Sequence, residues 1–121
     1  MKKGFTLVEI MIVVAIIGII IAIAVPAFLR ARENARGRAC QENLSKIDGA
    51  KEQYSLEEKA PNGYSSVTWS HLVKTSGTGY LKSTPVCPSI TNAYAINAIG
   101  TNPTCLFSQS DTTDYALHEI Q

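Results

Sequence analysis

The side chains of this sequence that could do chemistry are three cysteines and two histidines. Cys40, Cys87 and Cys105 could form a disulfide, or could hold a metal or redox centre. Metal-binding motifs place their ligands at short, regular spacing. The sequence has no C-x-x-C, no H-E-x-x-H and no Cys/His pair at such spacing around His71 or His118. We therefore expect no metal site and no cofactor.

Catalytic groups are equally hard to assemble from this sequence. No nucleophile with a base, no glycine-rich phosphate loop and no pair of carboxylates patterned as a pocket can be identified. Asp111 and Asp114 offer oxygen ligands for Ca²⁺, but a polar turn of Ser, Asp and Thr is the commoner meaning of such a segment. The sequence therefore predicts a protein that is not an enzyme.

The apolar residues are concentrated near the N-terminus. Fifteen of the sixteen residues from Ile10 to Val25 are apolar, and no charge occurs between Glu9 and Arg30. The uncharged stretch 10–29 has the length that an α-helix needs to cross a hydrocarbon core about 30 Å thick. The chain has 121 residues, and what remains beyond this stretch is too small to cover a helix that is apolar on all sides. We predict a membrane-spanning helix.

The residues before the apolar run carry a processing signal. A secretory signal has its small-residue junction after the apolar segment, whereas here the junction, Gly4–Phe5, lies before it. The segment resembles the processing motif of type IV prepilins and of the pseudopilins of type II secretion, through Lys2, Lys3, Gly4, Phe5, Thr6, Leu7, Val8 and Glu9. This resemblance implies that a membrane peptidase cuts between Gly4 and Phe5, removes residues 1–4 as a leader peptide and N-methylates Phe5.

Glu9 is the one acid at the edge of the apolar run, where an unpaired carboxylate is costly. In one interpretation it reaches the lipid headgroups and benefits from the positive end of the helix dipole. The resemblance implies another role, in which Glu9 stays unpaired until it meets the α-amino group of Phe5 on a neighbouring subunit during assembly. That amine is mostly protonated at neutral pH, and the attraction is strong at low dielectric.

Two residues are expected to weaken the apolar helix locally. Pro26 removes a backbone hydrogen bond and favours a kink, and Gly18 adds a second weak point. The resemblance implies that the helix bends or partly unwinds at such positions when subunits pack in a filament.

The chain turns polar after the span but keeps a helical pattern over residues 30–59. An apolar face is predicted through Leu29, Cys40, Leu44, Ile47 and Tyr54, with the stem of Lys51 along it. Glu42 and Lys46 are spaced for a helical ion pair. Four arginines follow the span at Arg30, Arg32, Arg36 and Arg38. They could contact lipid phosphates, acids of adjacent subunits, or DNA.

The arginines also affect the predicted orientation of the chain in the membrane. Counting positive charges on the two flanks would place the bulk of the chain in the cytoplasm. The resemblance places the head outside, in an inner-membrane protein with a single span, and we follow the resemblance.

The composition of residues 60–121 predicts a small globular domain, which we call the head. Ala60-Pro61-Asn62-Gly63 should end the helix. Residues 94–99 and 115–120 have the pattern of strands, with 80–82 a shorter candidate. We expect an α+β fold, in which the long N-terminal helix, with a membrane-spanning half (5–29) and an amphipathic half (30–59), is packed by a small antiparallel sheet.

Small exported domains are often stabilised by disulfide bonds. Cys87 and Cys105 are the better pair, because both adjoin Pro or turn-forming residues in the head. Cys40 would then be a buried thiol. Pairing of Cys40 with either of the others stays open, since connectivity cannot be deduced from sequence.

These observations favour a structural subunit of a type IV pilus-like filament that serves motility, adhesion or uptake. The resemblance implies as partners other copies of the chain, the inner membrane, the prepilin peptidase and an assembly platform, and it implies a periplasmic or extracellular filament. One alternative is a pseudopilin of a type II secretion system. An alternative of another class is a membrane-anchored binding module with a single span that never polymerises.

Overall fold

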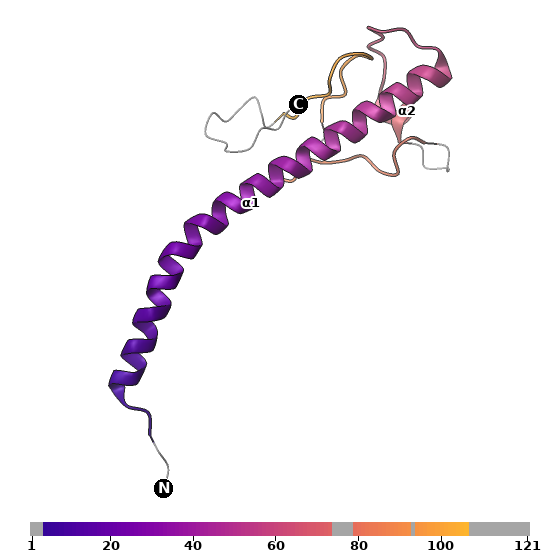
Figure 1. The fold of residues 1–121 in the computed structure, drawn as a ribbon. Coiled ribbons are helices and arrows are strands. Elements are labelled where there is room, and N and C mark those ends of the chain that lie inside the picture. Colours follow the sequence, from indigo (N-terminus) through magenta and orange to yellow (C-terminus); the bar gives the residue numbers. More distant parts are fainter. Residues whose placement is uncertain (1–3, 74–78, 93, 107–121) are drawn as a thin grey trace. The chain divides into compact units, whose positions relative to one another are not determined.

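The computed structural model describes residues 4–73, 79–92 and 94–106. Its main element is helix α1, Leu7–Glu58, which has 52 residues, and a short helix α2, Trp69–Leu72, follows it (Figure 1). The chain divides into two compact units, residues 1–32 and residues 33–121, and the boundary falls inside α1. The predicted long N-terminal helix is therefore confirmed.

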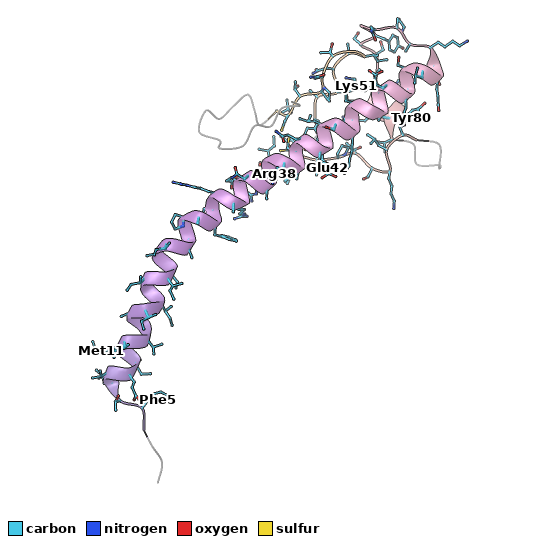
Figure 2. The ribbon with its side chains drawn as sticks, viewed as in Figure 1. Phe5, Met11, Arg38, Glu42, Lys51 and Tyr80 are labelled. Carbon is cyan, nitrogen blue, oxygen red and sulfur yellow. The ribbon has the colours of Figure 1, made fainter. Side chains whose placement is uncertain are left out.

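The first unit consists of the apolar part of α1. Every described side chain from residue 4 to residue 32 is exposed, and the side chains project on all sides of the helix in Figure 2. This stretch is long and apolar enough to cross a membrane, and none of it is buried. The helix is continuous through Gly18 and Pro26. A helix with this surface requires lipid or other protein chains around it.

In the second unit, α1 buries one face against the head. The buried residues recur at intervals of three and four: Gly37, Cys40, Leu44, Ile47, Ala50 and Lys51. Three members of the predicted face, Cys40, Leu44 and Ile47, are fully buried. Leu29 is not part of this face, because its side chain is 52% exposed and it belongs to the first unit.

Helix α1 ends at Glu58, just before the Ala60–Gly63 segment. Lys59 adopts a left-handed conformation with φ of 51°, and the Ser55 hydroxyl donates a hydrogen bond of 2.8 Å to the Ala60 carbonyl. Gly63, with φ of +89°, allows the chain to turn back, and its N–H donates to the Ile99 carbonyl at 2.9 Å. The turn thus joins the end of α1 to the head.

The predicted antiparallel sheet is not found among the described residues. Only isolated bridges occur there, a parallel one between Val73 and Leu81 and an antiparallel one between Ala95 and Thr104. The expected strand 94–99 is interrupted because Asn97 has φ of 57°, which takes the backbone out of the extended region. The expected strand 80–82 contributes only the Leu81 bridge, and residues 115–120 lie outside the described residues.

The described part of the head is therefore built from loops and the short helix α2, which pack on α1. Its core combines residues of α1 with Leu72 of α2 and with loop side chains, which include Val67, Tyr94, Ile96 and Ile99. Two hydrogen bonds between Ala95 and Thr104, each of 3.0 Å, fix the loop that carries Cys105. This packing places the three cysteines in one core.

Candidate assembly site and cysteine cluster

The start of α1 is closed by two side chains that hydrogen bond to each other. Thr6 donates from its backbone N–H and from its hydroxyl to Oε2 of Glu9, at 2.8 and 2.7 Å. The Glu9 N–H donates in return to the Thr6 hydroxyl oxygen at 3.3 Å. This is a capping box, which satisfies N–H groups that have no partner in the first turn of a helix.

In the single chain Glu9 therefore has Thr6 as a hydrogen-bond partner, whereas its pairing with the Phe5 amine of a neighbouring subunit concerns a contact between chains and stays a prediction. The Glu9 carboxylate accepts two hydrogen bonds through Oε2, whereas no hydrogen bond reaches Oε1 within the described part of the chain. Capping matters in a bilayer, because no water is available there for free N–H groups. The spacing Thr6-x-x-Glu9 immediately before an apolar run is the sequence signal that sequence reasoning missed.

The other predicted assembly residues lie near this cap. Phe5 precedes Thr6, and its side chain is 84% exposed (Figure 2). An added Cβ at Gly18 would meet nothing within 4 Å in the described structure. No intramolecular packing therefore requires a glycine there. Roles for Phe5, Gly18 and Pro26 in assembly stay predictions, because they concern contacts with other chains.

Ion pairs occupy the polar side of α1 in the second unit. The predicted pair forms, with Lys46 Nζ 2.7 Å from Glu42 Oε1, and this contact lowers the pKa of Glu42. Arg36 donates to Glu33 at 3.1 Å, whereas Arg38 is exposed (Figure 2). Part of the arginine cluster is thus already engaged with an acid of the same helix.

Lys51 is buried, although the sequence suggested only that its stem would lie along the apolar face. Its side chain has no exposed surface, and Nζ donates a hydrogen bond to the Thr101 carbonyl. Asp48 lies 3.7 Å away on the same helix. Burial lowers the pKa of Lys51, and the nearby Asp48 carboxylate opposes this effect. Lys51 therefore ties α1 to the loop that precedes Cys105.

The three cysteines converge in the core of the head. Cys40 comes from α1, while Cys87 and Cys105 come from two loops, and all three are buried and outside any disulfide. The Sγ atoms of Cys87 and Cys105 are 3.4 Å apart, and all three Sγ atoms lie within 4.8 Å of one another. Burial raises the pKa of the Cys40 thiol to about 12. Sequence spacing gave no sign of this cluster, because tertiary packing alone brings the residues together.

Polar contacts fix the residues around the cluster. The Asn43 side-chain amide donates to the Tyr94 hydroxyl at 3.2 Å and to the Val86 carbonyl at 3.3 Å. The Tyr94 hydroxyl in turn donates to the Val86 carbonyl at 3.5 Å. One residue of α1 thus holds both the loop next to Cys87 and the hydroxyl of Tyr94.

Comparisons with known proteins agree with the N-terminal motif and the apolar helix. Residues 1–25 match the family model described as the prokaryotic N-terminal methylation motif. The chain is 32% identical over 96 residues to type II secretion system core protein G of Pseudomonas aeruginosa, which covers 72% of this chain and 68% of that protein. It is 41% identical over 57 residues to type IV major pilin protein PilA of Myxococcus xanthus, covering 47% of this chain and 26% of the relative.

A third relative is likewise similar to only part of this chain. The chain is 53% identical over 51 residues to type IV major fimbrial protein FimA of Dichelobacter nodosus, covering 42% of this chain and 30% of the relative. The chain thus matches less than a third of the length of these two pilins. No solved structure matches the chain.

Proposed function

Because this chain belongs to the family of type IV pilins and type II secretion pseudopilins, we propose that it is a structural subunit of a pilus-like filament. The observation that carries the proposal is the apolar part of α1, in which every described side chain from residue 4 to residue 32 is exposed. Such a surface needs a partner, and copies of the same helix can supply one. Members of this family are structural subunits rather than enzymes.

We propose that the helix has two successive environments. Residues 5–29 first cross the inner membrane as a single span, with residues 30–121 outside the cytoplasm. Lipid chains are as apolar as these side chains, so packing between helices, rather than the hydrophobic effect, must favour assembly. The helix then leaves the bilayer and packs against other subunits in a periplasmic or extracellular filament, with bending at Gly18 and Pro26.

Processing prepares the helix for this step. Cleavage between Gly4 and Phe5 by a prepilin peptidase would create a new amine on Phe5, which is then methylated. The capping box supports a pairing of that amine with Glu9 of a neighbouring subunit. Thr6 uses only Oε2 of Glu9, so Oε1 can accept a hydrogen bond from a second chain while the helix stays capped. The charge of Glu9 and the cap it forms can therefore act together.

We also propose a disulfide bond and a small sheet in the head. The disulfide would join Cys87 and Cys105 in the oxidising space outside the cytoplasm, and the distance of 3.4 Å between their Sγ atoms supports it. A small antiparallel sheet is supported by the Ala95–Thr104 bridge alone. Peptide mapping of the protein under non-reducing conditions tests this disulfide. Protection of amides in residues 94–104 from hydrogen exchange tests the sheet.

A pseudopilin of a type II secretion system is the second candidate. It is favoured by the relative core protein G, whose similarity extends over 72% of this chain. The similarity to the two pilins covers less than half of the chain. Both candidates are filament subunits and share the assembly mechanism. A membrane-anchored binding module that never polymerises is a different function, and a full-length chain found only as a monomer would favour it. Salt-sensitive DNA binding that drops when Arg36 and Arg38 are neutralised would instead indicate a role in DNA uptake.

Electron microscopy of material sheared from cells tests the proposal. Long filaments that contain the chain indicate a pilus. Short filaments that appear only when the chain is overproduced with a secretion platform indicate a pseudopilin. If the full-length processed chain stays monomeric in the membrane under both conditions, the filament function is refuted.

A further inference from the structure

The cysteine cluster has a geometry that a disulfide alone does not require. A disulfide uses two sulfurs, yet Cys40, Cys87 and Cys105 bring three Sγ atoms within 4.8 Å of one another. We propose that in the reduced chain these three cysteines bind one Cu(I) ion through their thiolates. This site is independent of filament assembly, since all three ligands belong to one chain, Cys40 from α1 and the other two from the head.

The spacing of the sulfurs fits a single metal ion. With metal–sulfur bonds of about 2.3 Å, three sulfurs arranged in a triangle around one ion stand about 4 Å apart. The Sγ atoms of Cys87 and Cys105 are 3.4 Å apart, and no two of the three Sγ atoms are more than 4.8 Å apart. Changes of less than about 1 Å in these separations would therefore place all three sulfurs at bonding distance.

The ligand set selects the metal. Thiolates are soft ligands that favour Cu(I), Zn²⁺ and iron–sulfur clusters over hard cations. Structural Zn²⁺ sites take four ligands, and iron–sulfur clusters are commonly held by four cysteines. In the described part of the chain the group contains three residues and no fourth His, Cys, Asp or Glu. Cu(I) is satisfied by three thiolates, so it is the best match.

The surroundings also suit Cu(I). Cys40, Cys87 and Cys105 are each no more than 1% exposed, in a core that includes Leu44, Tyr94 and other apolar side chains. Exclusion of water protects a cuprous ion from oxidation. The Tyr94 hydroxyl in the same core accepts a hydrogen bond from Asn43 at 3.2 Å and donates to the Val86 carbonyl at 3.5 Å, so the polar group of this core is held in place.

The proposed ion and the proposed disulfide exclude each other. A bond between Cys87 and Cys105 would consume two of the three ligands, so Cu(I) occupies the cluster only when all three thiols are reduced. Cys40 is the residue that separates the two states. The disulfide does not use its sulfur, whereas the metal site requires it.

The test uses the full chain in detergent, reduced without oxygen, with three free thiols per chain counted before each measurement. Cu(I) is titrated in competition with a chromophoric Cu(I) chelator, and X-ray absorption at the copper edge counts the sulfur ligands. We expect one Cu(I) per chain, bound by three sulfurs. Failure of the fully reduced chain to take Cu(I) from the chelator would overturn the proposal, and so would two-sulfur coordination.

Variants assign the site to its residues. Cys40→Ser leaves the disulfide pair intact and should weaken Cu(I) binding by about 100-fold or more. Met11→Leu removes a sulfur outside the cluster, and Ile99→Val trims the same core without removing a ligand. Neither should change the affinity.

Wild-type affinity in Cys40→Ser, or an equal loss in Ile99→Val, would contradict the assignment. Circular dichroism checks that each variant keeps its helix. If Cys40→Ser does not fold, the sulfur count on the wild-type chain still decides the proposal.

Discussion

Thr6 and Glu9 hydrogen bond to each other in both directions at the first turn of α1, and both bonds donated by Thr6 end on the same carboxylate oxygen, Oε2. This relationship separates two roles of Glu9. One is to cap the helix within its own chain. The other, which we propose, is to offer a negative charge to the amine of a neighbouring subunit.

Substitution of Glu9 by Gln separates these two roles. A glutamine can still accept the Thr6 hydrogen bonds, because Gln serves in capping boxes as Glu does, but it carries no charge. We expect Glu9→Gln to be processed and inserted in the membrane normally, with filament yield reduced nearly as strongly as in Glu9→Ala, because the charge rather than the cap is what assembly needs. The measurement is the amount of subunit in the sheared fraction relative to the membrane fraction. Normal filaments from Glu9→Gln would show that charge is not needed.

Removal of the other half of the cap should loosen the helix start. Thr6→Ala removes the hydroxyl that accepts the Glu9 N–H, at an expected cost of about 1 kcal/mol to the first turn. Hydrogen exchange of the Glu9 amide in detergent micelles should become faster, while amides near Gly18 should not change. Thr6→Ser keeps the hydroxyl and is the matched control. Equal exchange in all three proteins would mean that the cap does not hold in the folded chain.

Lys51 should contribute to stability through both its stem and its hydrogen bond to the Thr101 carbonyl. Lys51→Ala removes both and leaves a carbonyl unsatisfied, which should cost about 1–3 kcal/mol in the free energy of unfolding. Lys51→Met keeps most of the stem and should cost less. The exposed Lys46→Ala is the control, with an expected change of less than about 1 kcal/mol. Thermal unfolding of the full chain measures all three, and a Lys51→Ala variant as stable as Lys46→Ala would refute this role.

The hydrogen bond of Tyr80 should make the stability of the folded chain depend on pH in the alkaline range. Its hydroxyl donates a hydrogen bond to the Glu57 carboxylate, which raises the pKa of Tyr80 from 10.0 to about 12. The folded chain therefore holds this proton more tightly than the unfolded chain. Its contribution to stability is complete below about pH 10 and is lost as the pH rises toward 12. The stability difference between wild type and Tyr80→Phe should shrink over that interval, and a constant difference would contradict the expected linkage.

The long helix and its apolar half could be predicted from the sequence, because both depend on local composition. The run from Ile10 to Val25 leaves no other structure available in a bilayer, and the periodic burial of Cys40, Leu44 and Ile47 follows from helical geometry. The capping box was also readable, since Thr6-x-x-Glu9 stands in the sequence, but the acid was interpreted only through its charge.

The head could not be predicted equally well, because its structure depends on contacts between distant residues. The apolar pattern of residues 94–99 indicated a strand, yet the left-handed backbone at Asn97 interrupts it. The convergence of Cys40 with Cys87 and Cys105 leaves no trace in local spacing. Burial of Lys51 was missed because its acceptor is a backbone carbonyl, which sequence patterns do not reveal.

The most direct test of the account is the intact mass of the chain in purified filaments, combined with sequencing from its N-terminus. We predict a polypeptide that begins at Phe5, carries one added methyl group on the terminal amine and retains the whole of α1. A filament subunit whose sequence starts beyond Val25 would lack the apolar helix, and that result would contradict assembly through it.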